Sequence, residues 1–190
     1  MDIQNNENIS ACNRIHLAFV TDEIYSMPTA VAITSLKENC NPESNYTIHI
    51  IANEISEFSR SKFKECECSN IKIDILDKKL DKRFYNIYKK DNDLHVSASA
   101  LLKMQLSDFL DDIDKVLYID GDVIIQKDLK ELYETDLGNY YAAVVKDLIS
   151  VRNINHLRKI GIKSKYYFNS GVMLLNLKKF REDDLSAKLI

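Results

Sequence analysis

The sequence predicts an α/β fold in which a mainly parallel β-sheet is flanked by helices. Short apolar runs alternate with segments of helical spacing along the 190 residues, a pattern typical of βαβ units and of a sheet covered on both faces. Only four glycines and two prolines occur, so no flexible linker divides the chain. Four aspartates stand at or just after predicted strands: Asp22, Asp120, Asp122 and Asp147. Ligands of such sheets bind beyond the carboxyl ends of the strands.

The first half of the chain predicts three strands and two helices. In chain order they are 15–21 (strand), 28–40 (helix), 46–52 (strand), 55–66 (helix) and 71–76 (strand). Pro28 suits a first helical turn, and Ser56 is a candidate N-cap. We expect Phe58 and Phe63 to pack against the core. The last strand alternates with a period of two, which indicates that one of its faces is buried.

The second half of the chain continues the alternation. Its segments are 97–110 (helix), 115–120 (strand), 123–126 (strand), 128–134 (helix), 140–147 (strand) and 171–177 (strand), followed by a terminal helix. In the first helix, Ala100, Leu101, Met104 and Leu110 lie near one face of an ideal α-helix. We expect that face to be buried.

Composition and net charge limit the classes of function that the chain can have. Apolar residues make up 45% of the chain and charged residues 29%, as in an ordinary globular domain. The net charge of -3 argues against a nucleic-acid partner, which normally requires a basic excess. No apolar run reaches the ~20 residues of a membrane span. The polar start lacks a signal peptide, so we expect a cytoplasmic protein with reduced cysteines.

The segment KVLYIDGDVIIQKDL (115–129) holds two aspartates between apolar runs. An unpaired carboxylate is costly away from water, so something must compensate Asp120 and Asp122. Two carboxylates separated by one residue, here Gly121, can turn toward a single hard cation such as Mg²⁺ or Mn²⁺. A solvated surface turn is the alternative, because Asp-Gly is a common turn dipeptide. The motif alone leaves both interpretations open.

Two other metal-dependent classes fit this motif poorly. A calcium loop would need an oxygen ligand at its fifth position and glycine at its sixth, where this chain has Ile124 and Ile125. Phosphatases of the haloacid dehalogenase class place a similar motif after their first strand. Here it follows a strand in the second half of the chain.

Three blocks of sequence, in the same order, resemble glycosyltransferase family 8. This family comprises retaining enzymes that include the lipopolysaccharide galactosyl- and glucosyltransferases and glycogenin. The blocks are IHLAFVTDEIYSMPTAVAITSL, LLKMQLSDFLDDIDKVLYIDGDVIIQKDLKELYETDLG and YYFNSGVMLLNLKKFR. The resemblance covers the N-terminal two thirds of such enzymes. It implies a polar tail at 1–14, an incomplete GT-A nucleotide-sugar-binding domain at 15–190, a UDP-hexose donor and a divalent cation, Mn²⁺ or Mg²⁺.

The resemblance also implies roles for individual residues. Asp120 and Asp122 would hold the metal that bridges the donor diphosphate, with Gly121 between them. In the uridine pocket, which would include Val20, Asp22 would accept a hydrogen bond from the uracil N–H and Tyr25 would stack on the base.

Further matched positions concern the rest of the donor. His95 and Ser97 fall in the segment that lines the diphosphate and ribose. Lys103 stands where the galactosyltransferases commonly have arginine, so it supplies a cation without bidentate geometry. Near the donor sugar the resemblance implies two catalytic residues, Asp147 and Asn169, together with Gly171.

The implied function is transfer of galactose or glucose from a UDP-sugar to a saccharide or glycolipid acceptor such as lipopolysaccharide. Retention would proceed through a covalent intermediate or through departure and attack on one face, and the sequence leaves both open. The family's D-Q-D block and its late metal-binding histidine are not found before Ile190. A nucleotide-sugar-binding fragment or regulatory module without turnover is therefore the alternative. We also expect a location at the inner face of the membrane, with peripheral contact made by a segment beyond Ile190.

Overall fold

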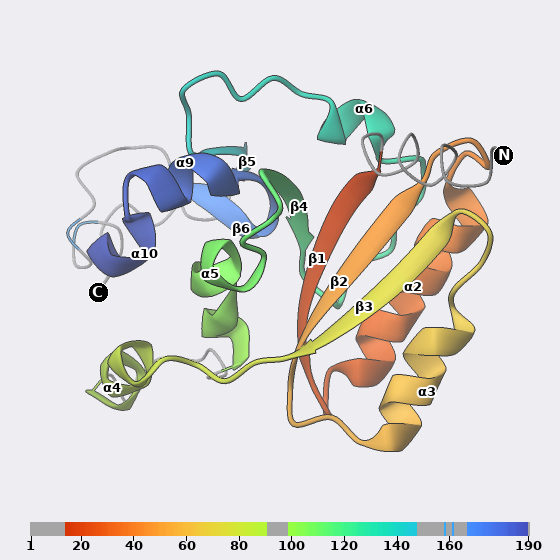
Figure 1. The fold of residues 1–190 in the computed structure, drawn as a ribbon, viewed down its shortest axis with the longest axis horizontal. Helices are drawn as coiled ribbons and strands as arrows, with labels where there is room; N and C mark the ends of the chain where they lie inside the picture. Colours follow the sequence, from red (N-terminus) through yellow and green to blue (C-terminus); the bar gives the residue numbers. More distant parts are fainter. Residues whose placement is uncertain (1–13, 91–98, 148–157, 159–160, 162–166, 190) are drawn as a thin grey trace, which may run out of the picture.

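The computed structural model describes residues 14–90, 99–147, 158, 161 and 167–189. Figure 1 shows the arrangement of their elements. The strands are β1 (Ile15–Asp22), β2 (Tyr46–Asn53), β3 (Ile71–Asp77), β4 (Lys115–Ile119), β5 (Ala142–Lys146) and β6 (Phe168–Asn176). The helices are α2 (Ser26–Asn39), α3 (Glu57–Glu65), α4 (Lys82–Lys90), α5 (Leu106–Phe109), α6 (Lys130–Tyr133), α9 (Leu177–Glu182) and α10 (Leu185–Lys188), with a 3₁₀-helix η1 (Ser99–Gln105).

Among the described residues, six strands form one sheet in the order β3-β2-β1-β4-β6-β5. β1 is parallel to both of its neighbours, β2 and β4, and β2 is parallel to β3. β6 runs antiparallel to β4 and β5. The predicted α/β fold with a mainly parallel sheet is therefore confirmed. No helix in the described part of the chain is long and apolar enough to cross a membrane.

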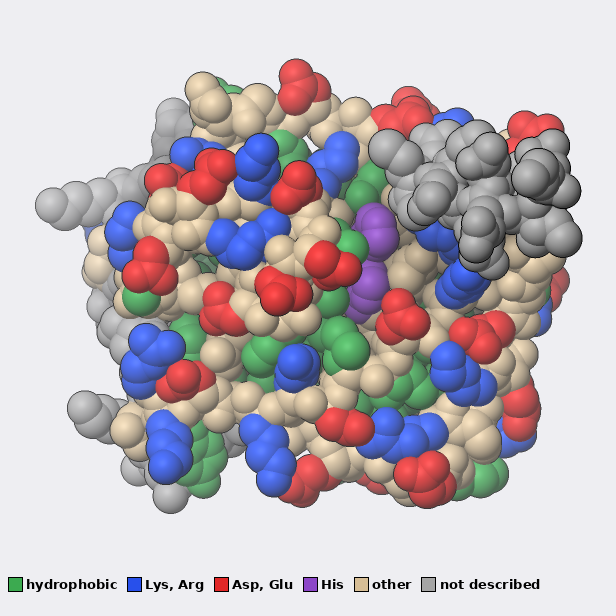
Figure 2. All heavy atoms as spheres, in the orientation of Figure 1, with side chains coloured by type: hydrophobic (Ala, Val, Ile, Leu, Met, Phe, Trp, Pro, Cys, Tyr) green, Lys and Arg blue, Asp and Glu red, His purple; other side chains and the backbone are tan. Residues whose placement is uncertain are grey.

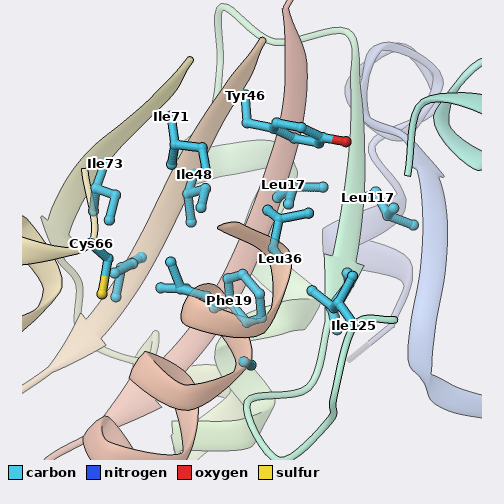
Figure 3. Close-up of a cluster of buried hydrophobic side chains, with 14 of the residues drawn as sticks. Leu17, Phe19, Leu36, Tyr46, Ile48, Cys66, Ile71, Ile73, Leu117 and Ile125 are labelled. Atoms are coloured by element: carbon cyan, nitrogen blue, oxygen red, sulfur yellow. The ribbon is translucent and has the colours of Figure 1, made fainter. Parts of the chain in front are cut away.

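Two apolar clusters pack against opposite faces of the sheet. On one face α2 and α3 cover β1, β2 and β3, and Figure 3 shows Leu36 of α2 close to Phe19 and Leu17 of β1. On the other face η1 and α5 contribute Leu102 and Leu106 to a second cluster with residues of β1, β4 and β6. The central strands are therefore buried on both sides, as their uninterrupted apolar runs predict.

Helix α3 begins at the predicted N-cap, but one of the two phenylalanines expected to pack is exposed. Ser56 is the N-cap, and its hydroxyl oxygen accepts a hydrogen bond from the Ser59 N–H at 3.1 Å. Phe63 is fully buried, whereas Phe58 is 70% exposed, so the expectation that both would pack was wrong. Residues five apart on an α-helix point about 140° away from each other, and a single flat sheet cannot bury both.

The predicted helix 97–110 is only partly α-helical. Its first two residues lie outside the described part of the chain, Ser99–Gln105 is a 3₁₀-helix, and only Leu106–Phe109 is an α-helix. The tighter 3₁₀ winding changes which side chains share a face. Leu102 and Leu106 are consequently buried together with Leu110, whereas Ala100, Leu101 and Met104 are only half-buried.

Residues 123–126 are not a strand, which corrects a second expectation. Ile125 inserts into the cluster beneath α2, and its backbone groups bond to that helix. Its N–H donates to Ser35 Oγ at 2.8 Å, and its carbonyl accepts from Asn39 Nδ2 at 3.1 Å. These side chains satisfy the polar backbone that a sheet ladder would otherwise satisfy.

Two helical regions complete the chain. α4 was not predicted, because it lies in a mainly polar stretch of sequence; its Phe84 is buried, and the neighbouring Tyr85 is exposed. The predicted terminal helix is present as α9 followed by α10. They are separated at Asp184, which adopts a left-handed backbone conformation with φ of 47° and so interrupts the helical path.

Helix α2 also makes close contact with the turn that follows β4. An alanine Cβ at Gly121 would lie 2.3 Å from Thr29 Oγ1 and 3.3 Å from Thr29 Cβ. Thr29 is fully buried. Its hydroxyl donates to the Tyr25 carbonyl at 2.8 Å and lies 3.2 Å from Thr21 Oγ1. The threonine therefore cannot rotate away without losing these contacts, and glycine is required by the close approach.

A pair of histidines lies on the face of the sheet that Figure 2 shows, among acidic side chains. His16 Nδ1 and His49 Nε2 are 3.0 Å apart, and the two rings are stacked. Burial, and next the neighbouring His16, lower the pKa of His49 from 6.5 to about 4. The Asp74 carboxylate, 3.7 Å from His49 Nδ1, opposes this shift without cancelling it. The folded protein therefore holds His49 neutral.

We expect Gly121→Ala to lower the free energy of unfolding by about 1–3 kcal/mol, the usual cost of overpacking. Chemical denaturation measures this loss. In a Thr29→Ala background the clashing hydroxyl is gone, so the same substitution should cost clearly less. An equal cost in both backgrounds would contradict the contact as its cause.

We expect the free energy of unfolding to fall as the pH drops from about 6.5 to 4. In this window the unfolded chain protonates His49 and the folded protein does not, so protons favour unfolding. At about 1.4 kcal/mol per pKa unit, this one group accounts for on the order of 3 kcal/mol. Denaturant titrations across this range should show a smaller loss for His49→Gln. Parallel pH profiles for the two proteins would overturn the assignment.

Candidate functional site

The carboxyl ends of β1 and β4 lie side by side at the centre of the sheet. Ala18 pairs with Tyr118 in the parallel register of these strands. β1 ends at Asp22, and β4 ends at Ile119, directly before Asp120 and the turn that carries Asp122. Parallel strands that end at one edge gather the residues that follow them. The chain thus brings together segments about a hundred residues apart in the sequence.

Asp120 lies between β4 and the start of β6. Its backbone N–H donates to the Gly171 carbonyl at 2.8 Å, which extends the antiparallel ladder of these two strands. A Cβ at Gly171 would lie only 2.7 Å from Asp120 Oδ2 and 3.0 Å from Asn169 Oδ1. Gly171 therefore lets the carboxylate of Asp120 approach the backbone of β6, and any larger residue would displace it.

Two residues hold the other oxygen of this carboxylate. Tyr118 donates its hydroxyl proton to Asp120 Oδ1 at 2.5 Å, and Lys103 Nζ lies 3.6 Å from the same oxygen. Lys103 also lies over the Tyr118 ring, 5.1 Å from its centroid. Burial, and next the charge of Asp120, raise the pKa of Tyr118 far above its usual value. The phenol therefore stays protonated and remains a donor.

Sequence reasoning missed Tyr118, and the contact of Lys103 with a donor stays a prediction. Residues two apart in a strand point to the same face, so the pattern Y-x-D could have indicated that Tyr118 and Asp120 meet. Lys103 was expected to face a donor. In this structure its ammonium bonds to the chain itself, at 3.3 Å from Ser170 Oγ and 3.4 Å from the Ser170 carbonyl.

Asp122 follows Gly121 in the turn and is exposed, while Gly121 is buried against α2. The described residues include no cluster of three or more His, Cys, Asp or Glu side chains suited to a metal ion. The two aspartates nevertheless supply hard oxygen ligands of the kind that Mg²⁺ and Mn²⁺ prefer. A cation held by Asp120 and Asp122 would need further oxygens, and a bound diphosphate can supply them.

The first predicted block lies at the end of β1. Val20 has its side chain buried in the second apolar cluster. Asp22 is half-buried, and its Oδ1 accepts a hydrogen bond from the Tyr25 N–H at 3.1 Å. Tyr25 is 46% exposed and stands just before α2. The aspartate therefore fixes the backbone of the tyrosine, whose ring remains accessible to a ligand.

The last block lies at the start of β6. Asn169 is exposed, and its Oδ1 accepts from the Gly171 N–H at 2.7 Å, which leaves the amide NH₂ pointing away from this turn. Asp147 follows β5, and its N–H donates to the Tyr167 carbonyl at 3.0 Å. Asn169 and Gly171 thus lie beside Asp120, and Asp147 lies on the next strand outward. His95 and Ser97 lie outside the described residues.

The chain matches the family described as Glycosyl transferase family 8 over residues 16–190. A lipopolysaccharide 1,2-glucosyltransferase of Escherichia coli K12 is 29% identical over 190 residues, covering 96% of this chain and 54% of that protein. Glycosyltransferase GlyE of Streptococcus pneumoniae is 28% identical over 159 residues, covering 83% of this chain and 35% of that protein. The chain thus spans about half the length of the first relative and about a third of the second.

Solved structures show the same architecture. The galactosyltransferase LgtC, in complex with donor and acceptor sugar analogues, is 29% identical with a TM-score of 0.71, covering 88% of this chain and 60% of that one. The bifunctional glycosyltransferase WbbM, at 21% identity, has a TM-score of 0.76 and covers 93% of this chain and 34% of its own. These likenesses confirm the expected GT-A fold. From the family match over residues 16–190 it follows that this chain belongs to glycosyl transferase family 8.

Proposed function

We propose that this chain forms the donor-binding part of a retaining, metal-dependent glycosyltransferase. It would move a hexose, galactose or glucose, from a UDP-sugar to a saccharide acceptor such as lipopolysaccharide or another surface glycan. One observation carries the proposal. The Asp120-Gly121-Asp122 turn lies at the carboxyl edge of the sheet, between the exposed Tyr25 beyond β1 and the Asn169–Gly171 entry to β6. The named activities of the lipopolysaccharide glucosyltransferase and of LgtC support the same class.

The two aspartates would hold the cation, Mn²⁺ or Mg²⁺, together with oxygens of the donor diphosphate. When bound there, the cation supplies Lewis-acid neutralisation of the charge that develops on the departing UDP. Asp120 is already oriented for this role by Tyr118 and Gly171. Asp122 is exposed and can turn toward the same point.

The remaining residues would recognise the two ends of the donor. Tyr25 would stack on uracil, and the second oxygen of Asp22 would accept the uracil N–H, because its first oxygen already bonds the Tyr25 backbone. The Asn169 amide and Asp147 would contact the hexose hydroxyls near the reacting carbon. Contacts of His95 and Ser97 with the diphosphate and ribose remain predictions, as does a cytoplasmic location at the membrane face.

A nucleotide-sugar-binding module without turnover is the second candidate. Among the described residues, Asp120 and Asp122 are the two carboxylates proposed to hold the cation, and no cluster of three or more metal-binding side chains is present. Transfer or donor hydrolysis from UDP-galactose or UDP-glucose would establish the enzyme. UDP binding with neither reaction would favour the module.

We expect UDP binding to require both the divalent cation and Asp122. Calorimetric titration should show affinity about tenfold or more weaker in EDTA, or with Asp122→Asn, since the charge that holds a hard cation is lost. Asp111→Asn makes the same chemical change in an exposed residue before β4, at the opposite end of the strand, and should bind normally. Equal UDP affinity with Mn²⁺, with EDTA and in Asp122→Asn would overturn the metal assignment.

We also expect Tyr25→Ala to weaken UDP binding by roughly 1–3 kcal/mol, the range for stacking of a base on an aromatic ring. Pyrophosphate with Mn²⁺ should bind the variant as it binds the wild type, because it has no base. Tyr140→Ala, which removes a tyrosine that is 77% exposed elsewhere, is the matched control. A loss of UDP affinity equal to the loss of pyrophosphate affinity would contradict a role for Tyr25 in base recognition.

A further inference from the structure

The Lys103 ammonium lies next to Asp120, one of the two carboxylates proposed to bind the divalent cation. Its Nζ lies 3.6 Å from Asp120 Oδ1 and 3.3 Å from Ser170 Oγ. The Lys103 side chain is only 13% exposed, and that of Asp120 is 39% exposed. This pair is therefore more protected from solvent than the exposed ion pairs whose energies are close to zero.

The surroundings of Asp120 favour a positive partner at all times. The carboxylate lies at the end of a buried strand, and a charge there is costly unless it is paired and hydrogen-bonded. Tyr118 supplies the hydrogen bond to Oδ1, and Lys103 supplies the charge. Among the described residues, Oδ2 has no hydrogen bond of its own and lies next to Gly171. The two oxygens of Asp120 therefore have different roles.

We propose that Lys103 is the internal counter-ion of Asp120 in the cation-free protein, and that it competes with a divalent cation for this carboxylate. The inference rests on the proposed function, which places a cation on Asp120 and Asp122. A cation approaching Oδ2 meets the field of an ammonium already paired with Oδ1 of the same group. Like charges at such separations repel, so Lys103 lowers the affinity for the cation alone.

This competition couples the cation to an anionic ligand. A diphosphate that arrives with the cation offers Lys103 another negative partner, and the ammonium can then leave Asp120. Each ligand therefore strengthens the binding of the other, by the same factor in both directions. Free cation binds weakly, and cation together with a nucleoside diphosphate binds well. Lys103 sets the size of this difference.

The test is the binding of Mn²⁺ alone, without nucleotide, followed by the electron paramagnetic resonance signal of the free ion. Lys103→Met keeps the unbranched chain over the Tyr118 ring and removes the charge. We expect it to bind Mn²⁺ about three- to tenfold more tightly than the wild type, the scale of a partly screened charge pair. In the same variant, the gain in Mn²⁺ affinity on adding UDP should shrink.

Lys115→Met is the matched control. It removes the same charge at the start of β4, where Lys115 lies over the Tyr133 ring, whereas Asp120 follows the other end of this strand. We expect its Mn²⁺ affinity to equal that of the wild type. Lys103→Gln provides a second neutral variant if the methionine variant does not fold, and thermal melting of each protein establishes folding.

The outcomes separate the inference from the proposed function. Unchanged or weaker Mn²⁺ binding in the folded Lys103 variants, with cation-dependent UDP binding intact in the wild type, would overturn the counter-ion role alone. A wild type that binds neither Mn²⁺ nor UDP, singly or together, would overturn the proposed function. Tighter Mn²⁺ binding in Lys103→Met but not in Lys115→Met supports the competition.

Discussion

The pairing of β4 with its two neighbours organises the whole carboxyl edge of the sheet. On one side the parallel register with β1 aligns the strand ends that lead to Asp22 and to Asp120. On the other side the antiparallel ladder with β6 extends to the bond between the Asp120 N–H and the Gly171 carbonyl. β1 and β4 are largely buried, and β6 is buried at Leu174 and Leu175, so the register cannot slip without turning core side chains outward. The site is therefore positioned by the same contacts that stabilise the fold.

Helix α2 supports the turn after β4 as much as the sheet does. Thr29 lies beneath Gly121, and Ser35 and Asn39 bond to the backbone of Ile125. The helix thus replaces the ladder partners that the segment after the turn lacks, and it buries Ile125 in the main cluster. A turn held at both ends and from below has a backbone with little conformational freedom, which reduces the entropy lost on binding a ligand.

The two aspartates at the carboxyl edge of the sheet differ in how their charges are compensated. Asp120 is paired inside the protein by Tyr118 and Lys103, whereas Asp122 is exposed. One carboxylate is thus rigid and the other adaptable, in a region whose other polar groups come from the starts or ends of β1, β5 and β6. This arrangement suits a ligand that brings its own charges of both signs, such as a cation with a diphosphate. Tyr118 and Lys103 together compensate the charge of Asp120 beside the apolar strands.

The sequence by itself determined the fold class, most element positions and the family, because strand and helix periodicity and ordered motifs are local properties. It placed strands at 15–21, 46–52 and 71–76 and the N-cap at Ser56 correctly. Only the tertiary structure decided that Phe58 faces solvent, that 123–126 is held by helix side chains, and that Lys103 pairs with Asp120. Each of these features depends on contacts between residues that are far apart in the sequence. Burial and charge pairing arise from such contacts, and the local sequence pattern does not encode them.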